Sequence, residues 1–211
     1  MKKQVHKKMK LAGAERRQLI LDAAMKMFSR NGFRGTTVRQ LARQAGISEA
    51  MIYHHFPSKE ALYDAMLEMR IEENRNILFP IDAAGAKKDR AVLEAIIGNY
   101  LRRQLSDSSF VRMLLFSALE GHELARKFVR EPMQDFFGFL GSYLDERANE
   151  GDLRPLNGPV TARLIMGMAF YFVLLCEIFK DPGSQGLSVE AITKDAVDLI
   201  CRGITISGCG E

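Results

Sequence analysis

"TVRQLARQAGISEAMIYHHF", Thr37 to Phe56, contains the start and stop signals of two short helices that are joined by a tight turn. Thr37 and Gln40 form a T-x-x-Q capping box, which is typical of a helix start, and Gly46 is suited to end that helix. Ser48 is a good N-cap for a second helix, which Pro57 stops. Two short capped helices around a glycine-bearing turn predict a helix-turn-helix motif.

The second helix of this motif should have one buried and one exposed face. At about 100° per residue, Ile52 and Phe56 lie within about 40° of each other, so we expect both to face the core. The opposite face carries Ala50, Tyr53 and His54, with Met51 and His55 at its flanks. A small residue permits close approach, while tyrosine and histidine donate hydrogen bonds to phosphates and base edges. The pattern predicts that this helix enters the major groove of DNA.

The adjacent histidines, His54 and His55, have two other interpretations. Neighbours on a helix diverge by about 100°, whereas residues that share a metal usually stand at i,i+3 or i,i+4. No Cys, Asp or second His stands at that spacing from either histidine, so we expect no metal site and no cofactor. A solvated surface pair without a role is the second alternative, and DNA contact is favoured over both.

Charge is unevenly distributed along the 211 residues. Residues 1–60 contain 13 of the 30 Lys and Arg residues but 4 of the 26 Asp and Glu residues. The remainder contains 17 against 22, so a basic N-terminal part precedes a mildly acidic body. The basic part favours a polyanionic partner such as double-stranded DNA. The first lysines form either a solvated tail or an arm that follows phosphates or the minor groove: Lys2, Lys3, Lys7, Lys8 and Lys10.

Helical periodicity extends through nearly the whole chain, and we find no alternating strand pattern of any length. We therefore predict an all-α fold with about nine to ten helices. The expected helices are 15–31, 37–45, 48–57, 58–78, 89–104, 108–119, 122–130, 132–149, 158–180 and 188–206, with a loop at 79–88.

The composition is typical of a cytoplasmic protein. Three cysteines without ligand spacing fit a reducing compartment better than a disulfide framework. No apolar segment of a signal peptide follows the basic start. The longest uncharged apolar run, Leu164 to Cys176, has 13 residues, which is short of the roughly 20 that span a membrane. We expect no membrane partner.

The last two predicted helices are strongly apolar. The helix at 158–180 is apolar nearly all round, so it should be buried on more than one side. Two such helices from each of two subunits would form a four-helix bundle across a two-fold axis. The candidate interface residues are Leu164, Phe172, Ile192, Ala196, Leu199 and Ile200. The alternative is that these helices form the core of a monomer.

The middle helices are rich in methionine and aromatic residues, which suit an apolar or aromatic ligand. The candidate ligand residues are Phe110, Met113, Phe116, Ser117, Phe137, Met166 and Phe170. Such a set is more often core than pocket. Glu120 and His122 would be either polar anchors for the ligand or, as we favour, a solvated helix end.

The segment Ile20 to Met66 resembles the DNA-binding domain of the tetracycline repressor (TetR) family. The resemblance rests on "LDAAMKMFSRNGF", the pair Thr36–Thr37, "LARQAGIS", "IYHHF" and "SKEAL". It implies a homodimeric repressor with a helical body that leaves a palindromic operator when a small molecule binds. It also implies a basic arm at 1–14, a DNA-binding domain at 15–57 and a ligand-binding and dimerisation domain at 58–211, beginning with a linking helix at 58–79.

The family's DNA contacts fall on Thr37, Arg39, Ser48, Ala50, Tyr53, His54, His55 and Lys59. We expect the side chains of Tyr53 and Lys59 to point outward. Glu49 departs from the family, because a lysine is frequent at this position. Ala50 and Met51 replace the common Gly or Pro and Thr or Ser, so the operator sequence cannot be transferred.

Two other classes of function stay open. An activator, or a regulator that senses a protein partner, would carry the same helix-turn-helix. A small all-α enzyme would use Glu120, His122 or Cys176, but no local spacing of a nucleophile with its base and no Gly-rich phosphate loop supports it. We therefore expect no enzymatic activity.

Overall fold

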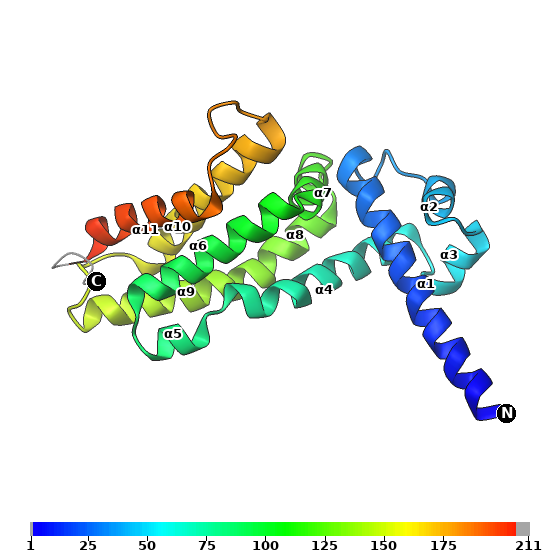
Figure 1. Ribbon diagram of the computed structural model, residues 1–211, viewed down its shortest axis with the longest axis horizontal. Helices are drawn as coiled ribbons and strands as arrows, with labels where there is room; N and C mark the ends of the chain where they lie inside the picture. Colours follow the sequence, from blue (N-terminus) through cyan, green and yellow to red (C-terminus); the bar gives the residue numbers. More distant parts are fainter. Residues whose placement is uncertain (1, 206–211) are drawn as a thin grey trace. The chain divides into compact units, whose positions relative to one another are not determined.

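The computed structural model describes residues 2–205, and it describes side chains for 13–73 and 79–205. The described chain is all-α, as predicted, and has an isolated β-bridge between Leu153 and Thr205 but no strand (Figure 1). Its helices are α1 (Lys2–Asn31), α2 (Val38–Ala45), α3 (Glu49–His55), α4 (Lys59–Leu78), α5 (Ile81–Gly85), α6 (Asp89–Ser106), α7 (Ser109–Leu119), α8 (Glu123–Arg130), α9 (Pro132–Asn149), α10 (Gly158–Val173), the π-helix η1 (Leu174–Phe179) and α11 (Val189–Ile204).

Three local features differ from the sequence prediction. Helix α1 begins at Lys2 rather than Glu15, so the basic arm continues the helix; its lysine side chains lie outside the described residues. The segment predicted as a loop at 79–88 contains the short helix α5. The helix predicted to reach 180 changes at Leu174 from α to π geometry.

The chain forms two compact units. Unit 1 contains the residues up to Ile71 together with Ser109–Phe128, and unit 2 contains Glu72–Ser108 together with the residues from Val129 onward. Packing therefore joins α7 and α8 to the N-terminal helices. The expected division of the chain by function, at 15–57 and 58–211, remains a prediction.

Unit 1 has a single aromatic and aliphatic core. Tyr63 of α4 is fully buried, and its ring meets the rings of Phe28 and Phe33 at centroid distances of 4.8 and 5.0 Å. Helix α7 contributes Phe110 and Met113 to the same cluster. Burial of these apolar side chains, at roughly 25 cal/mol per Å², ties the returning helix α7 to the N-terminal helices.

In unit 2, α10 packs with both α9 and α6, and α11 packs with α6. The buried stripe of α6 is Val92, Leu93, Ile96, Ile97 and Leu101. Cys176, at the π-helix, is a free thiol, whereas Cys201 is disulfide-bonded, which the cysteine spacing did not predict.

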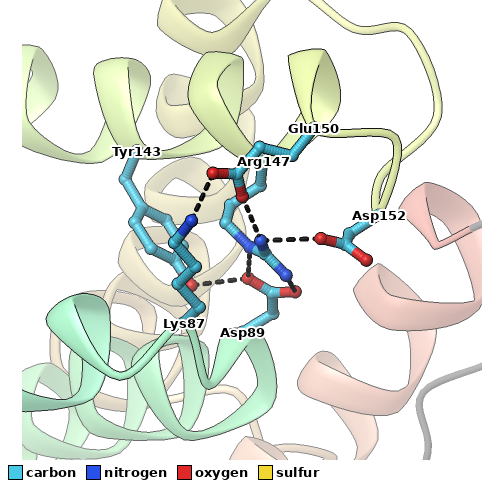
Figure 2. Close-up of polar contacts among 6 residues, drawn as sticks. All are labelled: Lys87, Asp89, Tyr143, Arg147, Glu150 and Asp152. Carbon is cyan, nitrogen blue, oxygen red and sulfur yellow. Dashed lines mark hydrogen bonds and ion pairs between the residues drawn. The ribbon is translucent and has the colours of Figure 1, made fainter.

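A polar cluster joins the start of α6 to the end of α9 (Figure 2). The Arg147 side chain, 8% exposed, donates to both carboxylate oxygens of Asp89 at 2.9 and 3.2 Å. The Tyr143 hydroxyl donates to the same carboxylate at 2.5 Å. Glu150 accepts from both Lys87 and Arg147, and Asp152 lies 2.7 Å from Arg147. A buried guanidinium is thereby surrounded by carboxylates, the arrangement that a buried charge requires.

Candidate nucleic-acid interface

Helices α2 and α3 begin and end where their capping residues require. The Thr37 hydroxyl accepts from the Gln40 N–H at 3.2 Å, and the Gln40 side chain accepts from the Thr37 N–H at 2.8 Å, so the capping box is confirmed. Gly46 ends α2 at φ 70°, a conformation that favours glycine. The Ser48 hydroxyl accepts from the Met51 N–H at 3.2 Å and opens α3.

The rotational phase of α3 is the predicted one. Ile52 and Phe56 are 2% and 3% exposed and belong to the core of unit 1. Tyr53 is 50% exposed, and Ala50 and His54 are also exposed. Because α3 is held by its buried side, its other side is free to approach the edges of base pairs.

The two histidines differ in surroundings. Their rings meet edge to face at a centroid distance of 5.3 Å, with His54 exposed and His55 half-buried. Burial, followed by the positive charges of His54, Arg16 and Arg17, lowers the pKa of His55 below its ordinary 6.5. The lowered pKa favours the neutral form of His55, in which one ring nitrogen donates and the other accepts.

Of the four other predicted DNA contacts, three are exposed, and the prediction for the fourth requires a correction. Thr37, Arg39 and Ser48 are exposed. The prediction that the Lys59 side chain points outward is wrong. Its ammonium donates to the backbone carbonyls of Phe33 and Thr36, both at 2.9 Å, and lies 4.0 Å from the centre of the Phe33 ring. These carbonyls attract the ammonium because the turn between α1 and α2 leaves them without helical partners.

Sequence reasoning missed two arginines beside α3. The Arg17 guanidinium lies 5.1 Å from the centre of the Phe56 ring, and the charges of Arg16 and Arg17 act on His55. Both come from α1, more than 30 residues earlier in the chain, and no spacing within the motif indicates them. They add positive charge beside the half-buried His55.

The interpretation of Glu120 and His122 as a solvated helix end is wrong. The Glu120 carboxylate accepts from the backbone N–H groups of Phe33 and Arg34 at 3.2 and 3.3 Å. The His122 ring lies 4.3 Å from the Phe33 ring, and its Nδ1 accepts from the Leu124 N–H at 3.2 Å, which caps α8. Both side chains serve the structure of unit 1.

Residues 20–66 match the family described as bacterial regulatory proteins, tetR family. The chain is also 34% identical to the HTH-type transcriptional regulator RutR of Escherichia coli O157:H7 over 141 residues, 65% of this chain and 60% of RutR. The match places residues 20–66 in the tetR family of bacterial regulatory proteins.

A second relative matches a shorter part of the chain. The HTH-type transcriptional repressor KstR2 of Rhodococcus jostii is 40% identical over 82 residues, 39% of this chain and 40% of KstR2. The chain thus spans less than two thirds of the length of RutR and of KstR2.

Two solved structures show the same fold. AibR, in complex with isovaleryl coenzyme A and operator DNA, has a TM-score of 0.67 at 21% identity and covers 87% of this chain and 97% of its own. FadR of Bacillus subtilis, in complex with stearoyl-CoA, has a TM-score of 0.67 at 19% identity and covers 87% of this chain and 96% of its own.

The ligand candidates fall in both units. In unit 1, Phe110 and Met113 are buried in the core, Phe116 is half-buried, and the Ser117 hydroxyl accepts from the Ala125 N–H at 2.9 Å. In unit 2, Phe137 and Met166 are half-buried and Phe170 is 37% exposed. Packing accounts for Phe110, Met113 and Ser117 without a ligand, and the assignment of all seven remains a prediction.

The dimer candidates separate into two groups. Ile192 and Ile200 are each 6% exposed within one chain, so packing within unit 2 already accounts for their burial, and their place in a dimer interface remains a prediction. Their side of α11 packs with α6, which the apolar pattern of α11 could not distinguish from an interface. Leu164 and Leu199 are 64% and 66% exposed, and Phe172 and Ala196 are half-buried.

Helix α10 has further exposed apolar side chains. Val160 and Tyr171 are 52% and 57% exposed on the same helix as Leu164. The segment Gly158–Phe179 is long and apolar enough to cross a membrane by length and composition alone, with 22% of its most apolar window buried. However, it contains Arg163 and Glu177, and charged side chains are costly inside a bilayer. A second copy of the chain would cover this apolar face equally well.

Proposed function

We propose that this protein is a dimeric DNA-binding transcriptional repressor that a small apolar or aromatic ligand releases from a palindromic operator. The observation that carries the DNA-binding part is the face of α3. Tyr53 and His54 are exposed on a helix whose opposite side, Ile52 and Phe56, is anchored in the core. Arg16 and Arg17 add positive charge beside α3, and Arg39 is an exposed cation of the preceding helix α2; positive charge attracts phosphates.

The proposal of a dimer follows from the size of this surface and from α10 and α11. One helix as short as α3 contacts few base pairs, whereas a two-fold dimer contacts two half-sites about one helical turn, 34–36 Å, apart. The exposed leucines Leu164 and Leu199 supply an apolar surface for the partner copy. We infer that they and the half-buried Phe172 and Ala196 form this interface.

The ligand class is inferred from the relatives. AibR and FadR, which share this fold, are described with isovaleryl coenzyme A and stearoyl-CoA, whose acyl groups are apolar. We infer an apolar ligand for this chain as well. A ligand releases the operator to the extent that it prefers the conformation with low DNA affinity.

We infer that the chain is not an enzyme. The relatives are transcriptional regulators, and the three side chains considered for catalysis have other roles or surroundings. Glu120 and His122 bind backbone groups of unit 1. Burial, followed by the charges of Glu177 and Asp181, raises the pKa of the Cys176 thiol, which disfavours the nucleophilic thiolate. A cytoplasmic location, where DNA is accessible, fits this role.

The test has two steps. First, the protein is allowed to select duplexes from a random palindromic library, and the affinity for the selected duplex is measured. Second, the measurement is repeated with short-chain and long-chain acyl-CoA, with free CoA as the control. Selection of a palindrome supports the regulator, and weaker binding with one acyl-CoA supports release by a ligand. Absence of any selected sequence would contradict the DNA-binding role, and unchanged affinity with every acyl-CoA would contradict this ligand class.

A further inference from the structure

The turn between α1 and α2, Gly32–Thr37, is held by groups from two other segments. On one side, its N–H groups at Phe33 and Arg34 donate to Glu120, which follows α7. On the other side, its carbonyls at Phe33 and Thr36 accept from Lys59 at the start of α4. The Glu120 carboxylate accepts from N–H groups of the turn, and the Lys59 ammonium donates to its carbonyls. Each charged side chain therefore binds backbone groups of complementary polarity.

The contact with Glu120 is close. Gly32 has φ 70°, and a Cβ atom at this position would lie 2.2 Å from Glu120 Oε1. Glycine is therefore needed here both for the backbone conformation and for the approach of the carboxylate. The Arg112 side chain of α7 also donates to the Ser29 carbonyl in the last turn of α1, at 3.2 Å. Helix α7 thus binds α1 and the turn at successive points.

The turn determines where α2 and α3 begin. Its last residue, Thr37, is the N-cap of α2, and α2 packs with α3. A displacement of the turn is therefore carried into the helix that would contact DNA. The segment Ser109–Phe128, which holds Glu120, is joined along the chain at both of its ends to segments of unit 2. The backbone therefore connects this segment directly to any conformational change in unit 2.

We propose that Glu120 is a positioning residue for DNA binding, which fixes the α1–α2 turn by accepting the N–H groups of Phe33 and Arg34. This inference rests on the proposed function and specifies how α7 acts on it. The hydrogen bonds select, among positions of the turn, the one that presents α3 to DNA. When these hydrogen bonds are lost, the turn leaves this position in a fraction of the molecules, and the apparent affinity for DNA falls accordingly.

Two conservative substitutions separate the hydrogen bonds from the charge. Glu120→Gln removes the charge but keeps an oxygen at the same reach, and one oxygen already accepts both N–H groups. Glu120→Asp keeps the charge but withdraws the oxygens by about 1.5 Å, beyond hydrogen-bonding distance. Glu68→Gln is the matched control, because it removes a carboxylate from an exposed position of α4 in the same unit.

Affinity for a duplex selected by the wild type is measured for the three variants, together with amide exchange at Phe33 and Arg34. We expect binding about tenfold weaker for Glu120→Asp, within about threefold of wild type for Glu120→Gln, and unchanged for Glu68→Gln. Exchange of the two amides should accelerate about tenfold in Glu120→Asp, while the unfolding midpoint falls by a few degrees at most.

Results that would overturn this inference can be distinguished from a result that would overturn the proposed function. If Glu120→Gln binds more weakly than Glu120→Asp, the charge rather than the hydrogen bonds determines affinity, and the inference is overturned. Equal affinity of all variants overturns it as well, while the proposed function stands. If the wild type selects no duplex, the proposed function fails first and this inference fails with it.

Discussion

At the scale of single residues, Tyr53 and Lys59 show how exposure and hydrogen-bond partners distinguish a proposed DNA contact from a structural contact. Tyr53 is 50% exposed on α3. We expect Tyr53→Ala to weaken binding to the selected duplex by about tenfold, because one contact to a phosphate or base is worth about 1–3 kcal/mol. The unfolding midpoint should not change. Fluorescence anisotropy and thermal unfolding measure the two effects, and a lowered midpoint would show that Tyr53 also supports the fold.

Lys59 should behave differently. Its ammonium donates to two carbonyls and lies over the Phe33 ring, so Lys59→Met should destabilise the protein by about 1–3 kcal/mol. Methionine keeps an apolar stem of similar length, and the loss therefore reports the ammonium alone. Denaturant titration gives the free energy of unfolding. Unchanged stability with weaker DNA binding would instead favour a phosphate contact by Lys59.

These two residues also show what the sequence could predict. The phase of α3 was predictable because helix geometry relates Ile52 and Phe56 to Tyr53 within a single turn and a half of helix. The orientation of Lys59 was not, because its partners lie 23 and 26 residues away and are backbone carbonyls, which any sequence supplies. Glu120 was harder still, at 86 and 87 residues from its partners.

At the scale of elements, the cluster in Figure 2 fixes the end of α9 to the start of α6. Asp89→Asn would remove the carboxylate that pairs with the buried Arg147. We expect a loss of about 2–4 kcal/mol, because a buried cation loses the carboxylate that accepts two of its hydrogen bonds. Asp152→Asn is the matched control: Asp152 contacts the same arginine but its side chain is 55% exposed, so the loss should be below about 1 kcal/mol. Denaturant titration of both variants measures the difference, and equal losses would contradict it.

His122, which lies between α7 and α8, should make the free energy of unfolding depend on pH. Burial is the main cause that lowers the pKa of His122 below 6.5, opposed by Glu120, Asp64 and Glu60 and assisted by Lys59. As pH falls below about 6.5, the unfolded chain takes up a proton that the folded chain resists. The contribution of His122 to stability is therefore complete above this pH and is lost as pH falls toward the lowered pKa.

His122→Asn isolates this effect, because asparagine can also cap α8 but does not titrate. We expect the free energy of unfolding to fall more steeply for the wild type than for His122→Asn between pH 7.5 and about 5.5. His54, His55 and the carboxylates are common to both proteins, so the difference in slope belongs to residue 122. Equal slopes would show that the folded protein accepts the proton without cost.

At the scale of the whole molecule, the sequence indicated which helices are apolar but not which of their faces meet. Helix α11 has apolar residues all along its length, and Ile192 and Ile200 were predicted to lie in a dimer interface together with Leu199. In the structure the two isoleucines are buried within one chain and Leu199 is 66% exposed. The apolar pattern is the same for both uses, so the distinction required the packing of α11 against α6.

The exposed leucines give the last prediction. Leu164→Glu should convert a dimer into a monomer, because a charge would replace an apolar side chain that is 64% exposed in one chain and covered in the proposed dimer. The fold of the monomer should persist, since this side chain has little burial to lose. Ile81→Glu is the control, an equally exposed apolar residue of α5 at 60%. Sedimentation equilibrium measures the mass, and binding to a palindrome should weaken together with dimerisation because one half-site is lost. A wild type that sediments as a monomer, or a Leu164→Glu variant that stays dimeric, would place the interface elsewhere.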